Sequence, residues 1–340
     1  MMCGKYFKRN KCSGMVVSWG NNITRSTSLA KVLGFDDFHV RPTFKLKYLK
    51  LINYIVAFLR SLWKILVSRP RELVLVGPPT FIFYAIPIIK CFLSETRVTC
   101  DFHNGVLRYP WAALPGLKRC IREADLVLSH NGKVKDEIDV FFGVNSRVLT
   151  DPLPAAHDTE GEVSSSHVSK IKLNVLVPCS FSIDEPVELI LDLCVFAAKK
   201  FNLIVTGDYN KIRKREGFKH AFGLANFTGF LPKEKYRHLL ASSDVVLCLT
   251  NDDSVQMCAS NEALGFSKLL LHSNTPVLNG LYSGKELAVD HSVCSIVSAI
   301  ERLDARKEYW QMYLGDVREF YQSRWHRQFE SVFSDGERSR

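Results

Sequence analysis

The sequence lacks several patterns that would place it in common protein classes. Its 340 residues contain no GxGxxG motif, so a nicotinamide site is not supported. There are ten cysteines, but no two form a CxxC pair and none combines with histidine at zinc spacing. Several cysteines, such as Cys194 and Cys248, lie in apolar runs, so we expect buried, reduced thiols in a cytosolic protein.

Neither a signal peptide nor an uninterrupted membrane span is evident. The first residues are basic, but no long apolar stretch follows them directly. The most apolar segment, residues 73–93, contains Pro78, Pro79 and Pro87. Because a spanning helix needs about 20 apolar residues with few breakers, we expect a buried strand, a turn and a helix there.

Acidic residues are absent between Arg41 and Arg71, where eight basic residues occur, and the whole chain carries a net charge of +10. Such a balance suits an anionic partner. Residues 44–66 mix lysine and arginine with apolar and aromatic residues. This fits a helix on an anionic bilayer, or equally a core-packed helix with a cationic rim. No nucleic-acid-binding motif accompanies the segment, so we expect no nucleic-acid partner.

The length favours two domains, and short apolar runs alternate with longer segments of helical period. Runs that are apolar throughout are typical of parallel strands covered on both faces, so we predict an α/β fold with two Rossmann-like, doubly wound sheets facing a cleft. A linker composition at 151–170 separates the domains. We expect domains at 1–160 and 171–305, and a helix at 306–332 packing back across both. The strands are expected at 15–17, 73–76, 97–102, 126–129, 175–177, 203–206, 226–228, 245–249 and 269–271.

Ligands of open α/β sheets bind at the carboxyl ends of the strands, so the loops there are the first candidates. In the first half, Gly20 and Arg25 precede a helix start that could hold an anion on the acceptor side. Asp101, His103 and Asn104 end another strand. Asp101 or His103 could accept a proton from a hydroxyl nucleophile, and Asn104 could contact the acceptor. His130, after the neighbouring strand, is a weaker candidate.

The second half contains the parts of a nucleotide-diphosphate site. Ser180 follows its first strand, where Asp184 and Glu185 are expected to open a helix. Gly207 follows the next strand, with Lys211 and Arg213 close behind, and basic side chains beside a flexible turn suit a diphosphate. Further along the chain we expect a turn and then a helix start, whose free N–H groups could receive a diphosphate. A carboxylate at this helix start could accept hydrogen bonds from ribose hydroxyls. The expected donor-binding residues here are Gly229, Phe230 and Leu231 in the turn, Ser254 in the loop before the helix, and Asn261 and Glu262 at the helix start.

The stretch 226–271 resembles the donor-binding half of GT-B glycosyltransferases of family four. The segments FTGFLP (227–232), ASSDV (241–245) and NEALGFSKLL (261–270) correspond to that family's TGxLP, ASADV and EAxxxGKP patterns. In addition, LVLVGPPT (73–80), CDFHN (100–104) and CSFSIDEP (179–186) are similar to segments of the β-mannosyltransferase that acts on dolichol-linked chitobiose. Together the matches run from about residue 14 to residue 300.

The resemblance implies transfer of a sugar from a nucleoside-diphosphate donor to an acceptor hydroxyl. We expect the acceptor to be a lipid-linked or cell-envelope saccharide at the inner face of a membrane. It implies no obligatory metal and no cofactor besides the donor. Ser254 stands where retaining members carry a second glutamate, and Leu269 stands where they carry proline, so the sugar and the stereochemistry stay open. In an inverting reaction Asp101 or His103 would be the base. In a retaining one, His103 would contact the donor sugar.

Two other classes stay open. The chain could be a non-catalytic GT-B-like docking subunit. The absence of an acidic residue at position 254 favours this alternative, whereas the intact CDFHN and NEALG segments argue against it. It could also be a nucleotide-sugar epimerase, which would need neither an acceptor nor a basic aromatic membrane segment.

Overall fold

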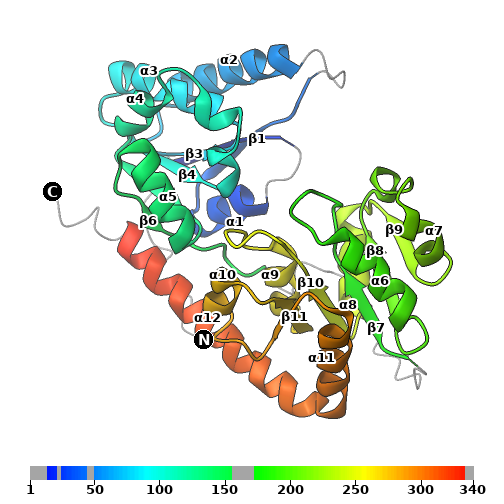
Figure 1. Cartoon of the computed structure of the whole chain (residues 1–340). Coiled ribbons are helices and arrows are strands. Elements are labelled where there is room, and N and C mark those ends of the chain that lie inside the picture. Colours follow the sequence, from blue (N-terminus) through cyan, green and yellow to red (C-terminus); the bar gives the residue numbers. More distant parts are fainter. Residues whose placement is uncertain (1–13, 21–23, 44–49, 155–171, 334–340) are drawn as a thin grey trace. The chain divides into compact units, whose positions relative to one another are not determined.

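The structure is a computed structural model that describes residues 14–20, 24–43, 50–154 and 172–333. The chain divides into two compact units, and each is described here by itself. The first unit comprises residues 1–152 and 328–340, and the second comprises residues 153–327. Each unit contains one parallel sheet of six strands with helices beside it (Figure 1). The predicted fold class of two Rossmann-like, doubly wound parallel-sheet domains is thus confirmed.

The sheet of the first unit has the strand order β2-β1-β3-β4-β5-β6. The order reverses between β1 and β3, and β1 and β3 are buried along almost their whole length. The strands are β1 (Gly14–Trp19), β2 (Asp36–Val40), β3 (Glu72–Gly77), β4 (Arg97–Phe102), β5 (Leu126–Ser129) and β6 (Arg147–Val148). The α-helices are α1 (Thr24–Leu33), α2 (Lys50–Ser68), α3 (Ala85–Phe92), α4 (Leu117–Arg122) and α5 (Gly132–Phe142).

The sheet of the second unit has the order β12-β11-β10-β7-β8-β9, so its switch point lies between β7 and β10. Its core joins the strands to the helices on both faces. The strands are β7 (Asn174–Val177), β8 (Asn202–Thr206), β9 (Asn226–Gly229), β10 (Val245–Cys248), β11 (Leu269–Ser273) and β12 (Ala288–Val289). The helices are α6 (Val187–Ala197), α7 (Glu216–Phe222), α8 (Lys233–Ser242), α9 (Cys258–Gly265), α10 (Pro276–Leu281), α11 (Val293–Ala305) and α12 (Lys307–Phe333).

The segment from 73 to 93 has the predicted form of a buried strand, a turn and a helix. Strand β3 leads into a 3-10 helix (Thr80–Tyr84) and then into α3, whose inward residues are buried. The prolines lie at or before the helix starts or in the first turn of α3, where a missing N–H costs little.

Helix α12 packs one stripe of its surface against protein. Its side chains at helical spacing, Trp310, Val317, Tyr321 and Trp325, are all less than a tenth exposed. Beyond Arg327 the helix belongs to the first unit, where the amide oxygen of Gln328 accepts hydrogen bonds from the backbone N–H and the hydroxyl of Thr150 (3.0 and 2.9 Å). Burial of long aromatic side chains is a large part of what fixes this helix.

Candidate functional site

Two loops meet at the switch point of the second unit, one after β7 and one after β10. The carbonyl oxygen of Asp184 accepts hydrogen bonds from the backbone N–H of Asn251 (2.6 Å) and from the hydroxyl of Thr250 (3.1 Å). The loops therefore lie side by side at the carboxyl ends of neighbouring strands. This is the place where an open α/β sheet receives its ligand.

The loop after β7 is organised by Glu185. Its carboxylate accepts hydrogen bonds from the backbone N–H groups of Ser180 (3.0 Å) and Ser182 (2.8 Å). These bonds hold the chain around Phe181, whose φ of 54° is unusual for a side chain of that size. Helix α6 begins only at Val187 with Pro186 as its N-cap, so the prediction that Glu185 opens this helix is wrong. Ser180 lies exposed on this loop.

The turn after β8 comes close to the same loop. Gly207 has a φ of 100°, and a Cβ atom at this position would collide with the carbonyl oxygen of Cys179, so only glycine fits. The Nζ atom of Lys211 donates a hydrogen bond to the carbonyl oxygen of Ser180 (2.6 Å). An ammonium group has three N–H donors, so Lys211 retains donors for a ligand at this edge. Arg213 lies exposed nearby in the sequence.

The turn after β9 is joined to the turn after β8. The backbone N–H of Gly207 donates to the carbonyl oxygen of Gly229 (3.0 Å), and Gly229 itself has a φ of 75°. The next side chain, Phe230, is 76% exposed, while Leu231 is half-buried. A largely exposed aromatic ring at a strand's carboxyl end offers a flat face to a planar ligand. The assignment of these three residues to the donor base stays a prediction.

Helix α9 begins at Cys258, so the predicted helix start at Asn261 and Glu262 is about three residues too late. No side chain caps this end, and Cys258 is exposed. The backbone N–H of Ser260 donates to the carbonyl oxygen of Met257 (3.1 Å), and the positive end of the helix dipole lies at this first turn, which suits an anion. Ser254 lies in the turn before the helix, where its N–H and hydroxyl both donate to Asp252 Oδ1 (2.8 and 2.6 Å).

Asn261 and Glu262 lie in the second turn of α9 and differ in their surroundings. Glu262 is half-buried. Burial raises the pKa of its carboxyl, and interaction with the hydroxyl of Tyr236 and with the nearby cations Arg237 and Lys233 offsets this rise only in part. Asn261 is buried and holds the helix in place: its Oδ1 atom accepts from the hydroxyl of Tyr282 (2.8 Å). The predicted contact between Asn261 and the donor is therefore not supported, because its amide is used inside the protein.

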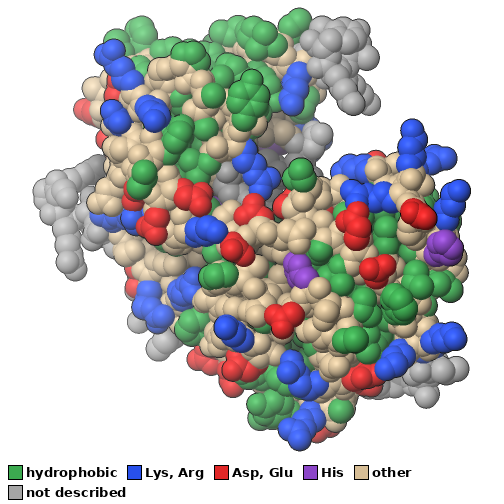
Figure 2. Space-filling model, in the orientation of Figure 1, with side chains coloured by type: hydrophobic (Ala, Val, Ile, Leu, Met, Phe, Trp, Pro, Cys, Tyr) green, Lys and Arg blue, Asp and Glu red, His purple; other side chains and the backbone are tan. Residues whose placement is uncertain are grey.

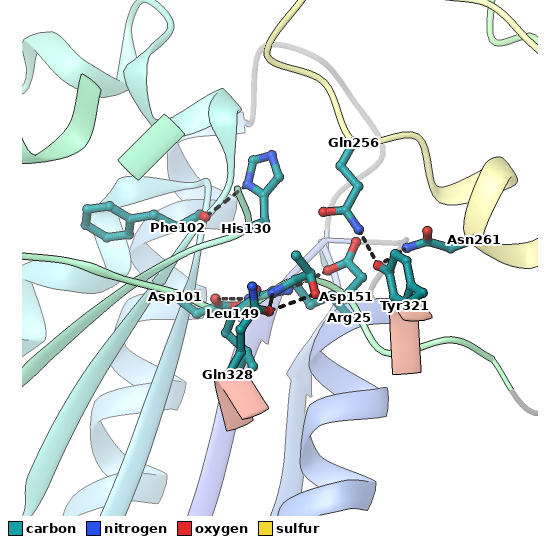
Figure 3. Close-up of polar contacts among 11 residues, drawn as sticks. Arg25, Asp101, Phe102, His130, Leu149, Asp151, Gln256, Asn261, Tyr321 and Gln328 are labelled. Carbon is teal, nitrogen blue, oxygen red and sulfur yellow. Dashed lines mark hydrogen bonds and ion pairs between the residues drawn. The ribbon is translucent and has the colours of Figure 1, made fainter. Parts of the chain in front are cut away.

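A residue of α12 completes this network, and the sequence analysis did not include it among the site residues. The hydroxyl of Tyr321 accepts hydrogen bonds from Asn261 Nδ2 (3.1 Å) and Gln256 Nε2 (2.8 Å) (Figure 3). Tyr321 thus joins Gln256, in the segment that precedes α9, to Asn261 within the helix. The aromatic stripe of α12 was visible in the sequence, but the partners of its hydroxyl groups were not.

In the first unit, Arg25 lies between two carboxylates (Figure 3). Its Nε and Nη2 atoms each donate to one oxygen of Asp101 (both 2.7 Å), and its Nη1 atom donates to Asp151 (2.5 Å). Arg25 and Asp101 are both buried. The predicted roles of Asp101 as a base and of Arg25 as an anion-binding residue do not suit this geometry, because each neutralises the other. Through its two carboxylate partners, Arg25 joins the end of β4 to the chain after β6.

His103 follows the same strand and is half-buried. Its ring stacks on that of His130, with the centroids 5.4 Å apart. Burial lowers the pKa of His103, and the charge of Arg25 lowers it further. Burial and the neighbouring His103 lower the pKa of His130 to about 4. Both imidazoles are therefore neutral near pH 7, and a neutral imidazole can accept a proton.

The remaining predicted residues of the first unit lie at the same edge of its sheet. Gly20 follows β1 and has a φ of 126°, and its N–H donates to the carbonyl oxygen of Val40 (3.2 Å). Asn104 begins a 3-10 helix (Asn104–Leu107), but its side chain lies outside the described residues. Across the described ranges, no group of three or more His, Cys, Asp or Glu side chains could hold a metal ion.

Comparison with known proteins finds similarity at the level of structure. No family model matches the chain, and no curated protein matches it. Anabaena HepE in complex with UDP and glucose aligns with a TM-score of 0.64 and 10% identity, covering 95% of this chain and 100% of HepE. A glycosyltransferase from Rickettsia africae aligns with a TM-score of 0.59 and 12% identity, covering 96% and 95%.

The N-terminal domain of trehalose-6-phosphate phosphatase from Candida albicans has the same fold. It aligns with a TM-score of 0.63 and 12% identity, covering 94% of this chain and 89% of that domain. Identities this low establish the GT-B fold alone. The activity has to be argued from the residues.

Proposed function

We propose that this protein is a glycosyltransferase that moves a sugar from a nucleoside-diphosphate sugar to an acceptor hydroxyl. The observation that carries the proposal is the start of α9 at the switch point of the second sheet, where no side chain caps the helix, with Lys211 bonded to the loop after β7. A helix start and a cation together suit a diphosphate, which carries charge and many acceptor oxygens.

The second unit would bind the donor. The first N–H groups of α9 and the free donors of Lys211 would bind the diphosphate, and the carboxylate of Glu262 would accept hydrogen bonds from ribose hydroxyls. Phe230 would stack on the base, with Gly229 allowing the turn. HepE contains UDP and glucose in its complex, which supports a uridine nucleotide as the first donor to test. The same N–H groups and Lys211 would stabilise the departing diphosphate, so no metal is required for that step.

The first unit would bind the acceptor, and His103 is the better candidate for the base. Its imidazole is neutral and half-buried, whereas both oxygens of Asp101 are held by Arg25. In an inverting reaction the acceptor hydroxyl gives its proton to His103, and its oxygen forms a bond to the anomeric carbon. The bond from that carbon to the diphosphate breaks, and the nucleoside diphosphate leaves. A retaining reaction needs no such base, and His103 would then contact the donor sugar.

The acceptor we propose is a lipid-linked or cell-envelope saccharide, reached by a cytoplasmic protein at the inner face of a membrane. The net charge of +10 and the acid-free stretch from Arg41 to Arg71 support an anionic surface as partner. The similarity of CDFHN and CSFSIDEP to a dolichol-linked chitobiose mannosyltransferase supports a lipid carrier.

A screen of nucleotide sugars for thermal stabilisation tests the proposal. A ligand at 100 times its Kd adds about 2.7 kcal/mol to the stability of the protein it binds. We expect one nucleoside-diphosphate sugar to raise the melting temperature clearly while free sugars do not. If no nucleotide or nucleotide sugar stabilises the protein, the proposed donor site is wrong.

The reaction products then separate this proposal from its alternatives. A transferase releases nucleoside diphosphate slowly without acceptor and faster with it. An epimerase converts the sugar without an acceptor. A docking subunit, which the serine at position 254 would favour, binds without turnover. Nuclear magnetic resonance of the product identifies inversion or retention.

A further inference from the structure

Helix α2 is apolar on two sides, and only one side is used inside the protein. Ala57, Ser61 and Ile65 are buried, and the indole N–H of Trp19 donates to the hydroxyl of Ser61 (2.9 Å). This hydrogen bond and the three buried side chains fix one face of α2 against the rest of the first unit. One face of α2 therefore agrees with the second alternative from the sequence, a helix packed against the core.

The opposite side of α2 carries large apolar side chains that are exposed over about half of their surface or more. They lie three or four positions apart and so form one line along the helix, which we call the outer stripe. In Figure 2 hydrophobic side chains gather at the top of the view, over the α2 and α3 of Figure 1. The outer stripe consists of Ile52 (44% exposed), Ile55 (52%), Leu59 (58%), Trp63 (67%) and Val67 (63%).

The next helix extends this apolar surface. Helix α3 packs against α2, and its last residue, Phe92, is 68% exposed. A protein that stays monomeric rarely exposes an apolar patch of this extent without a partner. We therefore expect a binding partner to cover the outer stripe.

The charges beside the outer stripe indicate what kind of binding partner is compatible with it. Arg60 and Lys64 are one turn apart, on the row of α2 next to Leu59 and Trp63. Since no acidic residue occurs from Arg41 to Arg71, a second copy docked stripe to stripe would bring cations together without partners. An anionic bilayer accepts both the apolar side chains and the bordering cations.

By length and composition α2 could also cross a membrane. The packed inner face argues against a crossing. Besides Ser61, Tyr54 stacks on Phe81 and meets the edge of Trp111, each at 5.5 Å between ring centroids. These contacts would be lost if α2 left the protein, so we do not expect α2 to span a membrane.

The same aromatic contacts connect α2 to the candidate acceptor site. Trp111 begins a 3-10 helix (Trp111–Ala113) in the segment that follows His103, and Tyr109 in this segment is 88% exposed. The amino-terminal half of α2 is thus packed against the chain just after the proposed base.

We propose that the outer stripe of α2 is the surface by which this protein binds an anionic bilayer. Leu59 and Trp63 enter the interfacial region, Arg60 and Lys64 contact lipid phosphates, and the segment from His103 to Trp111 lies beside the membrane. The delivery of a lipid-linked acceptor to His103 rests on the proposed transfer reaction, whereas the bilayer contact itself does not.

Sedimentation of the full chain with vesicles tests this inference. The vesicles are pure phosphatidylcholine, or phosphatidylcholine with a minority of phosphatidylglycerol. We expect the protein to sediment with the anionic vesicles, less so in raised salt and much less with the neutral ones. The double variant Leu59→Glu/Trp63→Glu and the charge reversal Arg60→Glu/Lys64→Glu should each lower the partition coefficient about tenfold or more.

A matched control is Met312→Glu on α12, because Met312 is as exposed as the stripe (75%) but lies in the second unit. It should sediment as the original protein does, and all variants should keep their melting temperature. Transfer to a soluble acceptor should also be unchanged in the stripe variant, so loss of vesicle binding and loss of the proposed activity are separable.

Three outcomes would overturn the inference. The original protein could fail to bind anionic vesicles, or the stripe variant could bind them as well as the control does. A third is that the original protein is a dimer in solution and the stripe variant is a monomer, which would make the outer stripe an interface between copies of this chain.

Discussion

Replacing Asp101 by asparagine separates a structural role of this residue from a catalytic one. The variant keeps the size of the side chain but removes its charge, so Arg25 stays buried with Asp151 as its single carboxylate partner. Breaking a buried ion pair costs about 3–5 kcal/mol. Because Asp151 still binds Arg25, we expect a loss near the lower limit, about 3 kcal/mol. For a unit of this size that lowers the melting temperature by about 6–12 °C.

The matched control is Glu301→Gln, which removes an exposed ion pair. Lys200 Nζ lies 2.5 Å from Glu301, but the two side chains are 55% and 49% exposed. Such pairs contribute under about 1 kcal/mol, so the control should melt within a few degrees of the original protein. Scanning calorimetry and urea denaturation measure both variants. If Asp101→Asn melts like the control while its transferase activity is lost, then Asp101 acts in catalysis and the structural account is wrong.

Three further predictions concern packing and protonation. Gly207→Ala should prevent folding or cost several kcal/mol, whereas Gly280→Ala, which meets no atom within 4 Å, should leave urea stability unchanged or raised. Tyr321→Phe removes the acceptor of the Asn261 amide and should cost about 1–3 kcal/mol by urea denaturation, with weaker donor binding by calorimetry. The pKa of His130 is about 4 in the folded state, so the unfolded state binds more protons between pH 4 and about 6.5, and stability falls as the pH is lowered through this range. His130→Gln should reduce that slope by up to about 1.4 kcal/mol per pH unit, and an unchanged slope would contradict the assignment.

The central strands of both sheets could be predicted because burial on both faces makes them apolar throughout. Residues 97–102 and 126–129 were predicted with the bounds of β4 and β5. The three strands that the sequence analysis missed, β2, β6 and β12, all lie at the edges of their sheets. An edge strand is covered less and is often short, so its sequence has no continuous apolar run: β2 begins with two exposed aspartates, and β6 and β12 have two residues each.

The candidate site could be predicted by location but not by role. The expected loops do lie at the strands' carboxyl ends, because the βα pattern alone dictates this. The hydrogen-bond and ion-pair partners of each polar group could not be predicted from the sequence, because they come from distant parts of the chain. Asp101 meets Arg25 across 76 positions, and Asn261 meets Tyr321 across 60. A polar residue after a strand can therefore contact a ligand, or it can be buried and join two segments of the chain. Its interaction partners in the structure distinguish the two roles.

Calorimetric titration with uridine diphosphate and its sugars tests the central claim, that the second unit binds a nucleoside diphosphate at the start of α9. The original protein and Glu234→Ala, a control at an exposed glutamate of α8, should bind equally. Glu262→Ala should abolish binding with little change in melting temperature, because the side chain is half-buried and its carboxylate is expected to contact ribose. Equal affinity for the original protein and Glu262→Ala would contradict the assignment of the donor site.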